Sequence, residues 1–217
     1  MFIGHFALGF GAKRLNPAVS LGTLFLACQL ADLIWPTLVL LGIERLAIDP
    51  GNTAFTPLDF ISYPYSHSLL ALVIWGLLFG GICAVVVRDR RVLLVVAALV
   101  VSHWVLDWIT HRPDMPLTFT GGTKVGLGLW NSVPGTVAVE VAMLTVGVWM
   151  YAQATRPRDK TGRRAFAAFV VFLLAAYFGS IGPPPPSITA LVVAAIAGAA
   201  VIFVWAWWFD RHRMPDS

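Results

Sequence analysis

The sequence predicts an all-α integral membrane protein, a polytopic bundle of about six transmembrane helices with a short, half-inserted N-terminal helix. Of its 217 residues, 58% are hydrophobic and 12% are charged, whereas a soluble domain carries about 25% charged residues. Nine Trp and fourteen Phe add bulk suited to lipid contact and to the membrane interfaces. The apolar residues also collect in segments long enough to cross a bilayer, which requires roughly 17–25 residues.

Six apolar segments are the expected spans, at residues 18–43, 67–87, 92–110, 135–152, 165–181 and 187–209. Residues 2–12 form a further apolar piece that is too short to cross, at ~16 Å of helix. We expect it to insert about halfway, although the sequence leaves open a position along the membrane surface. The chain is interpreted as a single membrane domain, 1–217. Residues 1–152 would hold the site, and 165–209 would be two packing or anchoring helices.

Basic residues are grouped in short loops between the apolar segments, at 88–91, at 153–164 and in the tail after residue 210. Lys and Arg are enriched in cytoplasmic loops. We therefore expect these loops and the C-terminus on the cytoplasmic side of a bacterial inner membrane, with 44–66 and 111–134 outside. The net charge of +4 then reflects topology and membrane lipid, and no nucleic-acid partner is expected. The oligomeric state is left open.

Ionisable side chains inside the apolar segments are the candidates for function, because they are rare and costly there. At a helical rise of about 1.5 Å per residue, all of them fall in the outer half of the membrane. They come from five separate segments: His5, Asp32, His67, His103, Asp107 and Glu140.

The strongest pattern is His103 with Asp107, which are spaced i, i+4 and so share one face of a helix. His111 is a further turn along, with its Cα ~12 Å from that of His103, so a continuous helix would keep it from the same ion. Neutral His and ionised Asp suit Zn²⁺ and also Mn²⁺. The sequence predicts one divalent ion, Zn²⁺ before Mn²⁺, with the ligands His5, Asp32, His67, His103 and Asp107.

Each of these residues also has a structural interpretation when it is taken alone. A single intramembrane His is commonly a hydrogen-bonded packing residue. Asp32 could contact Gln29 one turn earlier, and Glu140 could be structural. His111 and Arg112 could simply follow a helix C-terminus, where cations are favoured. The common leaflet and the chelating spacing favour the metal site.

Short motifs in residues 1–117 carry a resemblance to a known family. They read Gly4-His5, Ala31-Asp32, Ser66-His67-Ser68-Leu69, Ser102-His103 with Asp107, and Thr110 to Leu117. In order and spacing they resemble the YdjM-like family of bacterial membrane-bound metal-dependent hydrolases. The chain departs from that family in having Ala31-Asp32-Leu33-Ile34 in place of Pro-Asp-x-Asp, and Ser62 to Tyr65 in place of His-Arg-Gly. The resemblance implies metal-dependent hydrolysis. The missing carboxylate and the missing Arg argue against a second metal, and the remaining residues suffice for one ion.

The resulting hypothesis is a hydrolase that acts near the outer face on a lipid-linked phosphoester, another ester or a small molecule. Glu140 is the candidate general base or a partner of a ligand, and His111 is a second candidate catalytic group. Arg112 and Lys124 would bind an anionic headgroup, since Arg suits bidentate phosphate contacts.

Two alternatives remain at this point. A transporter or binding protein for a metal ion or proton would also use intramembrane His and Asp, but it predicts polar residues through the inner leaflet, where these helices are apolar. A degenerate family member would keep the ion as a structural tie.

Overall fold

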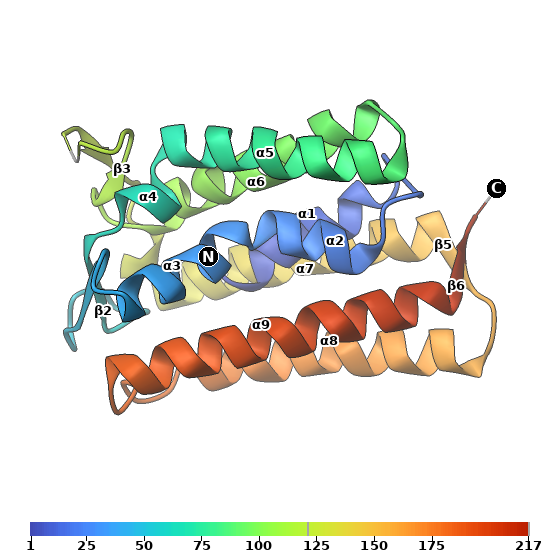
Figure 1. Cartoon of the computed structure of the whole chain (residues 1–217). Helices are drawn as coiled ribbons and strands as arrows, with labels where there is room; N and C mark the ends of the chain where they lie inside the picture. The colour runs from blue at the N-terminus through green and yellow to red at the C-terminus, as the bar shows by residue number, and fades with distance from the viewer. Residues whose placement is uncertain (121, 217) are drawn as a thin grey trace.

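A computed structural model describes residues 1–120 and 122–216 of the chain. Across these residues, five helices are long and apolar enough to cross a membrane, which confirms the all-α polytopic bundle. They lie side by side in Figure 1 and have the bounds α5 Leu69–Val87, α6 Arg91–Thr110, α7 Val133–Ala154, α8 Lys160–Ser180 and α9 Ile188–Arg211. A sixth span is present if the bent pair α2 and α3 is counted as one.

The first apolar segment, expected as one span over 18–43, is broken in two. Helix α2 is Leu21–Cys28 and helix α3 is Leu30–Leu40, with a bend of 56° between them. The break falls at Gln29, whose φ of −115° and ψ of 12° are not helical. Apolar composition predicts that a segment is buried in lipid or protein, but it carries no information about such a bend.

Helix α1, Ile3–Ala12, lies in the middle of the bundle with α2 (Figure 1), between the α5–α6 pair and the α8–α9 pair. It packs against α2, α6 and α7. A Cβ on Gly147 of α7 would meet the Ala7 backbone of α1, with the Ala7 Cα at 2.7 Å. Glycine therefore allows these two helices to touch backbone to backbone, as in other membrane bundles.

The other close pair is α5 with α6, which are antiparallel neighbours in Figure 1. Gly76 and Gly80 of α5 face the backbone of α6, where an added Cβ on Gly80 would lie 2.7 Å from the carbonyl oxygen of Leu93. The Gly-x-x-x-Gly spacing thus positions α6, the helix that carries His103 and Asp107.

Short connections cover both ends of the bundle. One end, called here the β1–β4 end, holds two small antiparallel ladders, the short helix α4 and a 3₁₀ turn. Their bounds are β1 Arg45–Ile48, β2 Leu58–Ser62, α4 Pro64–His67, β3 Met115–Pro116, β4 Lys124–Val125 and η1 Leu129–Asn131. At the opposite end, β5 Thr155–Pro157 pairs with β6 Arg213–Pro215.

The start of α5 differs from the sequence expectation in a way that affects the site. His67 was expected to open this helix, but it is the last residue of α4. Ser68 lies between the two helices in an extended conformation, and its side chain accepts a hydrogen bond from the Ala71 N–H. A Ser N-cap of this kind begins a new helix, so the chain turns at Ser68 and His67 faces the bundle interior.

Candidate metal centre

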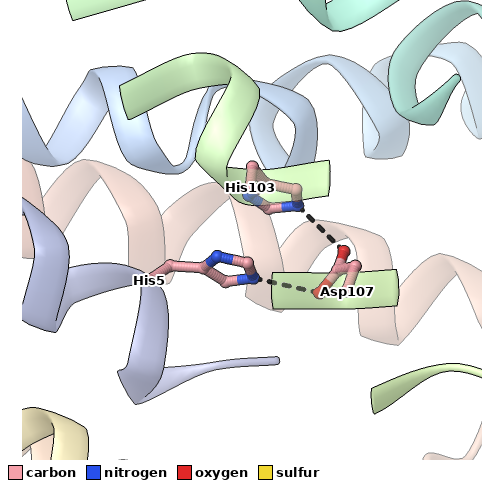
Figure 2. A group of neighbouring side chains, drawn as sticks. All are labelled: His5, His103 and Asp107. Carbon is pink, nitrogen blue, oxygen red and sulfur yellow. Dashed lines mark hydrogen bonds and ion pairs between the residues drawn. The ribbon is translucent and has the colours of Figure 1, made fainter. Parts of the chain in front are cut away.

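The five side chains predicted as ligands come together near the β1–β4 end of the bundle. The potential ligand atoms of His5, His103 and Asp107 lie within 4.8 Å of one another, and so do those of Asp32, His67 and His103. Figure 2 shows the first group, in which His5 comes from α1, and both His103 and Asp107 come from α6. Helices far apart in the sequence therefore converge on one cluster.

Asp107 is the centre of this cluster because each of its oxygens has its own partners. Its Oδ2 lies 3.1 Å from His103 Nε2, and its Oδ1 lies 3.1 Å from His5 Nε2. Both contacts are drawn in Figure 2. The His5 and His103 rings are stacked, with centroids 3.8 Å apart. The i, i+4 spacing thus places the α6 pair as predicted, and α1 adds the third group.

Asp32 and His67 form the second side of the cluster. His67 Nε2 lies 3.4 Å from Asp32 Oδ1 and 3.9 Å from Asp107 Oδ2. His103 Nε2 is 3.9 Å from the same Asp32 oxygen. The Asp32 side chain is 42% exposed, whereas His67 and His103 are buried. Asp32 is therefore the member through which the cluster can be reached.

The orientation of His103 indicates that a cation belongs between it and Asp107. His103 Nδ1 lies 2.8 Å from the carbonyl oxygen of Cys28, an acceptor, so the ring donates its Nδ1 proton there. A neutral His103 then turns the lone pair of Nε2 toward the carboxylate oxygen of Asp107. That nitrogen is buried, and its contact with Asp107 Oδ2 is an ion pair only when Nε2 carries a proton. Two acceptors 3.1 Å apart repel unless a positive charge lies between them, and either a proton on Nε2 or a metal ion can supply it.

His111, four residues after Asp107, also lies beside this cluster. Helix α6 ends at Thr110, and His111 follows in an extended conformation. Its Nε2 comes within 3.9 Å of Asp107 Oδ2. Its Nδ1 lies 3.0 Å from Asp114 Oδ1. A carboxylate can only accept, so Nδ1 carries the proton and Nε2 faces Asp107. His111 is thus oriented in the same way as His103.

Asp114 is the hub that holds His111, and sequence reasoning did not select it. Its carboxylate accepts from the Tyr63 hydroxyl at 2.9 Å and from Arg112 Nε at 3.3 Å. Burial alone would raise the pKa of Asp114, but the hydrogen bonds from His111, Tyr63 and Arg112 outweigh burial and lower it. Burial also lowers the pKa of His111, which favours the neutral ring that a metal requires.

One partner of Asp107 is not a side chain. The α-ammonium group of Met1 lies 2.5 Å from Asp107 Oδ1 and 3.3 Å from the hydroxyl of Thr110. A buried carboxylate needs a cationic or donor partner. Asp107 Oδ1 therefore contacts both the α-ammonium group and His5 Nε2, and Oδ2 contacts His103 Nε2.

Glu140, a candidate general base, is a residue of α7. Its side chain contacts the beginning of α1 and is not among the grouped ligand atoms. Its Oε2 accepts from the backbone N–H groups of Phe2 at 2.8 Å and of Gly4 at 3.1 Å. Its Oε1 is buried and has no hydrogen-bond partner. The first N–H groups of a helix lack intrahelical partners, so Glu140 satisfies two donors at the N-terminal end of α1.

The two predicted headgroup-binding cations are not alike. Arg112 is paired with Asp59 and with Asp114, so carboxylates already occupy its guanidinium group. Lys124 lies in β4 with its Nζ 3.4 Å from the carbonyl oxygen of Ile61. Its side chain is exposed, and it remains a candidate for an anionic group at this end of the bundle.

No protein-family model matches the chain, and no curated protein or solved structure matches it significantly. The class of the protein is therefore described from its fold and its His/Asp cluster. It is a polytopic helical membrane protein whose His and Asp side chains form two overlapping groups of three, each compact enough to hold a metal ion.

Proposed function

We propose that the protein is a metal-dependent hydrolase of the membrane and that it cleaves a lipid-linked phosphoester or ester at the Asp107 cluster. One observation carries this proposal. His103 Nε2 is buried and lies 3.1 Å from the acceptor Oδ2 of Asp107. His67 and His111 direct the same ring atom toward that oxygen, at 3.9 Å each.

The donor set is compatible with Zn²⁺ first and Mn²⁺ second. It consists of imidazole nitrogens and carboxylate oxygens, and it contains no thiolate, a combination found at catalytic Zn²⁺ sites. Such an ion, when bound, supplies Lewis acidity and lowers the pKa of a coordinated water. The resemblance of residues 1–117 to YdjM-like hydrolases supports the same reaction class.

An apolar cavity supports a lipid substrate. A cavity of about 610 Å³ lies between α1, α6 and α7, lined by side chains such as Leu8, Leu99 and Met143. Its polar lining residue Ser102 donates its hydroxyl to the carbonyl oxygen of Leu99, so the walls suit hydrocarbon. The cavity begins about one helical turn beyond His5 and extends along α1 toward Leu15, and none of the five predicted ligands lines it. This lining offers no relay for an ion, which disfavours the transporter alternative.

Within this proposal the protein residues have separate tasks. His5, Asp32, His67, His103 and Asp107 would bind the ion, with His111 beside them. The exposed edge at Asp32 would admit water and the headgroup, and Lys124 would attract an anionic headgroup. The apolar helices would keep bulk water out of the site, which strengthens the electrostatic interactions inside it.

The first test is metal content. We expect the purified protein to hold about one divalent ion per chain, and His103→Ala and Asp107→Ala to lose it. Both variants should retain the helical circular dichroism of the wild type. Lys160→Ala, a change at the opposite end of the bundle, is the matched control and should keep the metal. A wild-type protein without stoichiometric metal would contradict the proposal.

The second test is turnover on a panel of lipid phosphoesters and carboxylic esters with added Zn²⁺ or Mn²⁺. We expect hydrolysis by the wild type and a loss in Asp107→Ala that exceeds the roughly 10–100-fold effect of removing a ligand's hydrogen-bond partner. Bound metal without turnover of any ester would favour a structural ion instead.

A further inference from the structure

Glu44 is a buried carboxylate, 1% exposed, that neither the cluster nor the membrane fold explains. It lies between α3 and β1, and its Oε1 accepts from the backbone N–H groups of Tyr65 and Ser66 at 2.9 and 3.0 Å. Its Oε2 lies 2.6 Å from the Ser66 hydroxyl. The same hydroxyl lies 2.7 Å from Nδ1 of His67, so a continuous chain of polar contacts leads from Glu44 to the cluster.

The donors and acceptors in this series of contacts determine which atom carries each proton. Glu44 as a carboxylate has no proton to give, so the Ser66 hydroxyl donates its only proton to Glu44. The Ser66 oxygen can then only accept from His67, and the proton of His67 must lie on Nδ1. In the neutral ring, Nε2 of His67 consequently carries a lone pair, and it faces Asp32 and Asp107.

We propose that Glu44 is a positioning residue which, through Ser66, holds His67 in the tautomer that can bind a metal ion through Nε2. The inference rests on the proposed metal centre. It adds Glu44, at the β1–β4 end, to the residues that position the proposed ligands. His103 and His111 reach the same state through Cys28 and Asp114, so all three rings keep Nδ1 protonated by giving it an acceptor.

The isosteric change Glu44→Gln separates this role from a structural one. The two backbone N–H groups at the Oε1 position still require an acceptor, so the amide oxygen takes that place and the NH₂ group faces Ser66. The Ser66 oxygen then accepts from Gln and must donate to His67 Nδ1. His67 shifts its own proton to Nε2, the atom that should bind the metal.

The experiment measures the affinity of the full-length protein for Zn²⁺, by competition with a chelator in detergent. We expect Glu44→Gln to weaken binding by about 10- to 100-fold, the range for a ligand's hydrogen-bond partner. Ser66→Ala removes the acceptor without imposing a wrong donor, and it should weaken binding less. The double variant Glu44→Gln/Ser66→Ala should bind as tightly as Ser66→Ala alone, because the misdirected hydroxyl is gone.

A second readout does not depend on bound metal. Nitrogen-15 NMR of the imidazole groups in the metal-free protein reports which ring nitrogen carries the proton, and His67→Asn identifies the His67 signals. We expect the proton on Nδ1 in the wild type and on Nε2 in Glu44→Gln.

The outcomes distinguish this inference from the function on which it rests. A wild type that binds no Zn²⁺ would remove the metal centre, while the NMR experiment would still decide the role of Glu44. Wild-type affinity in Glu44→Gln, or a double variant that binds no tighter than Glu44→Gln, would overturn the inference. A merely misfolded Glu44→Gln protein would not be rescued by the loss of one more hydroxyl.

Discussion

At the scale of single residues, Glu140 shows how position changes the interpretation of an intramembrane carboxylate. Its sequence context suggested a general base, and the structure places it on the backbone N–H groups of Phe2 and Gly4. These bonds fix the start of α1, the helix that carries His5. Under the proposed function, Glu140 would therefore affect metal binding without touching the substrate.

This placement leads to a prediction for two variants of Glu140. Glu140→Gln should keep its metal, because the amide oxygen can accept both backbone bonds. Glu140→Ala releases the end of α1 and should weaken Zn²⁺ binding by about 10- to 100-fold. Chelator competition on both purified variants is the measurement. A Glu140→Gln protein that keeps its metal but loses all turnover would instead assign Glu140 the role of general base.

A second residue-scale prediction concerns the buried pair at the opposite end of α1. Lys13 Nζ lies 2.7 Å from Asp210 Oδ2, and Asp210 also accepts from Tyr151 at 2.8 Å. Lys13→Met would leave the buried carboxylate without its cation, which costs about 3–5 kcal/mol in unfolding free energy. Denaturant unfolding in detergent measures this loss.

The matched control for this pair is the double variant Lys13→Met/Asp210→Asn, which removes both charges. It should recover much of the lost stability, because replacing a whole buried ion pair is far less costly than breaking it. Equal instability of the single and double variants would show that packing, and not the unpaired charge, is responsible.

The ligand candidates could be predicted because an ionisable group inside an apolar segment stands out, and His103 with Asp107 has chelating spacing. Glu44 and Asp114 could not be found in this way, since acidic residues are ordinary in loops and their value depends on tertiary contacts. The only sequence indication for Asp114 is its i+3 spacing from His111. His111 itself was placed too far away, because its distance was taken from His103 and not from Asp107, four residues before it.

At the scale of elements, the contact between α1 and α7 sets the position of His5. The backbone of α1 at Ala7, about half a turn past His5, lies directly against Gly147 of α7. Only a glycine in α7 permits this approach. The position of α1 in the bundle therefore depends on the absence of a side chain at Gly147. The position of His5 relative to Asp107 depends on it as well.

Gly147→Ala should push α1 away from α7 and cost about 1–3 kcal/mol, as expected for overpacking. It should also weaken Zn²⁺ binding, because His5 moves with α1. Gly198→Ala in α9 is the control, since nothing lies within 4 Å of its added Cβ. That change should leave metal affinity unaltered and raise stability by about 0.5–1 kcal/mol. Unaltered affinity in Gly147→Ala would remove the proposed link between helix packing and the site.

The five long helices could be predicted from hydropathy, because a bilayer imposes both length and composition on a span. The expected segment 92–110 differs from α6, Arg91–Thr110, by one residue at its start. The break at Gln29 and the separate helix α4 could not be predicted. Both depend on hydrogen bonds to distant parts of the chain, to His103 in one case and to Glu44 in the other.

At the scale of the whole molecule, the cluster and the buried Lys13–Asp210 pair occupy opposite ends of a short central helix. The β1–β4 end and the β5–β6 end lie at opposite sides of the bundle in Figure 1. The two ends of the bundle are therefore chemically distinct. The distribution of Lys and Arg predicts that the β5–β6 end is cytoplasmic.

Cysteines introduced at Thr120 and Lys160 test this arrangement in a background without Cys28 and Cys83. In intact cells an impermeant thiol reagent should label the cysteine at 120 and spare the one at 160. Permeabilised cells should show labelling of both, which controls for reactivity. Labelling of both positions from the outside would contradict the topology, and labelling of 160 alone would invert it.

The bend between α2 and α3 has a consequence for how this site can be studied. The break frees the carbonyl oxygen of Cys28 to accept from His103, so the partner of a central ligand is main chain. Any amino acid at position 28 supplies the same atom. A mutational scan would thus report only on the packing of the buried side chain at position 28 and would miss the contact altogether. At His103 a backbone carbonyl oxygen accepts the Nδ1 proton, whereas a side chain accepts it at His67 and at His111.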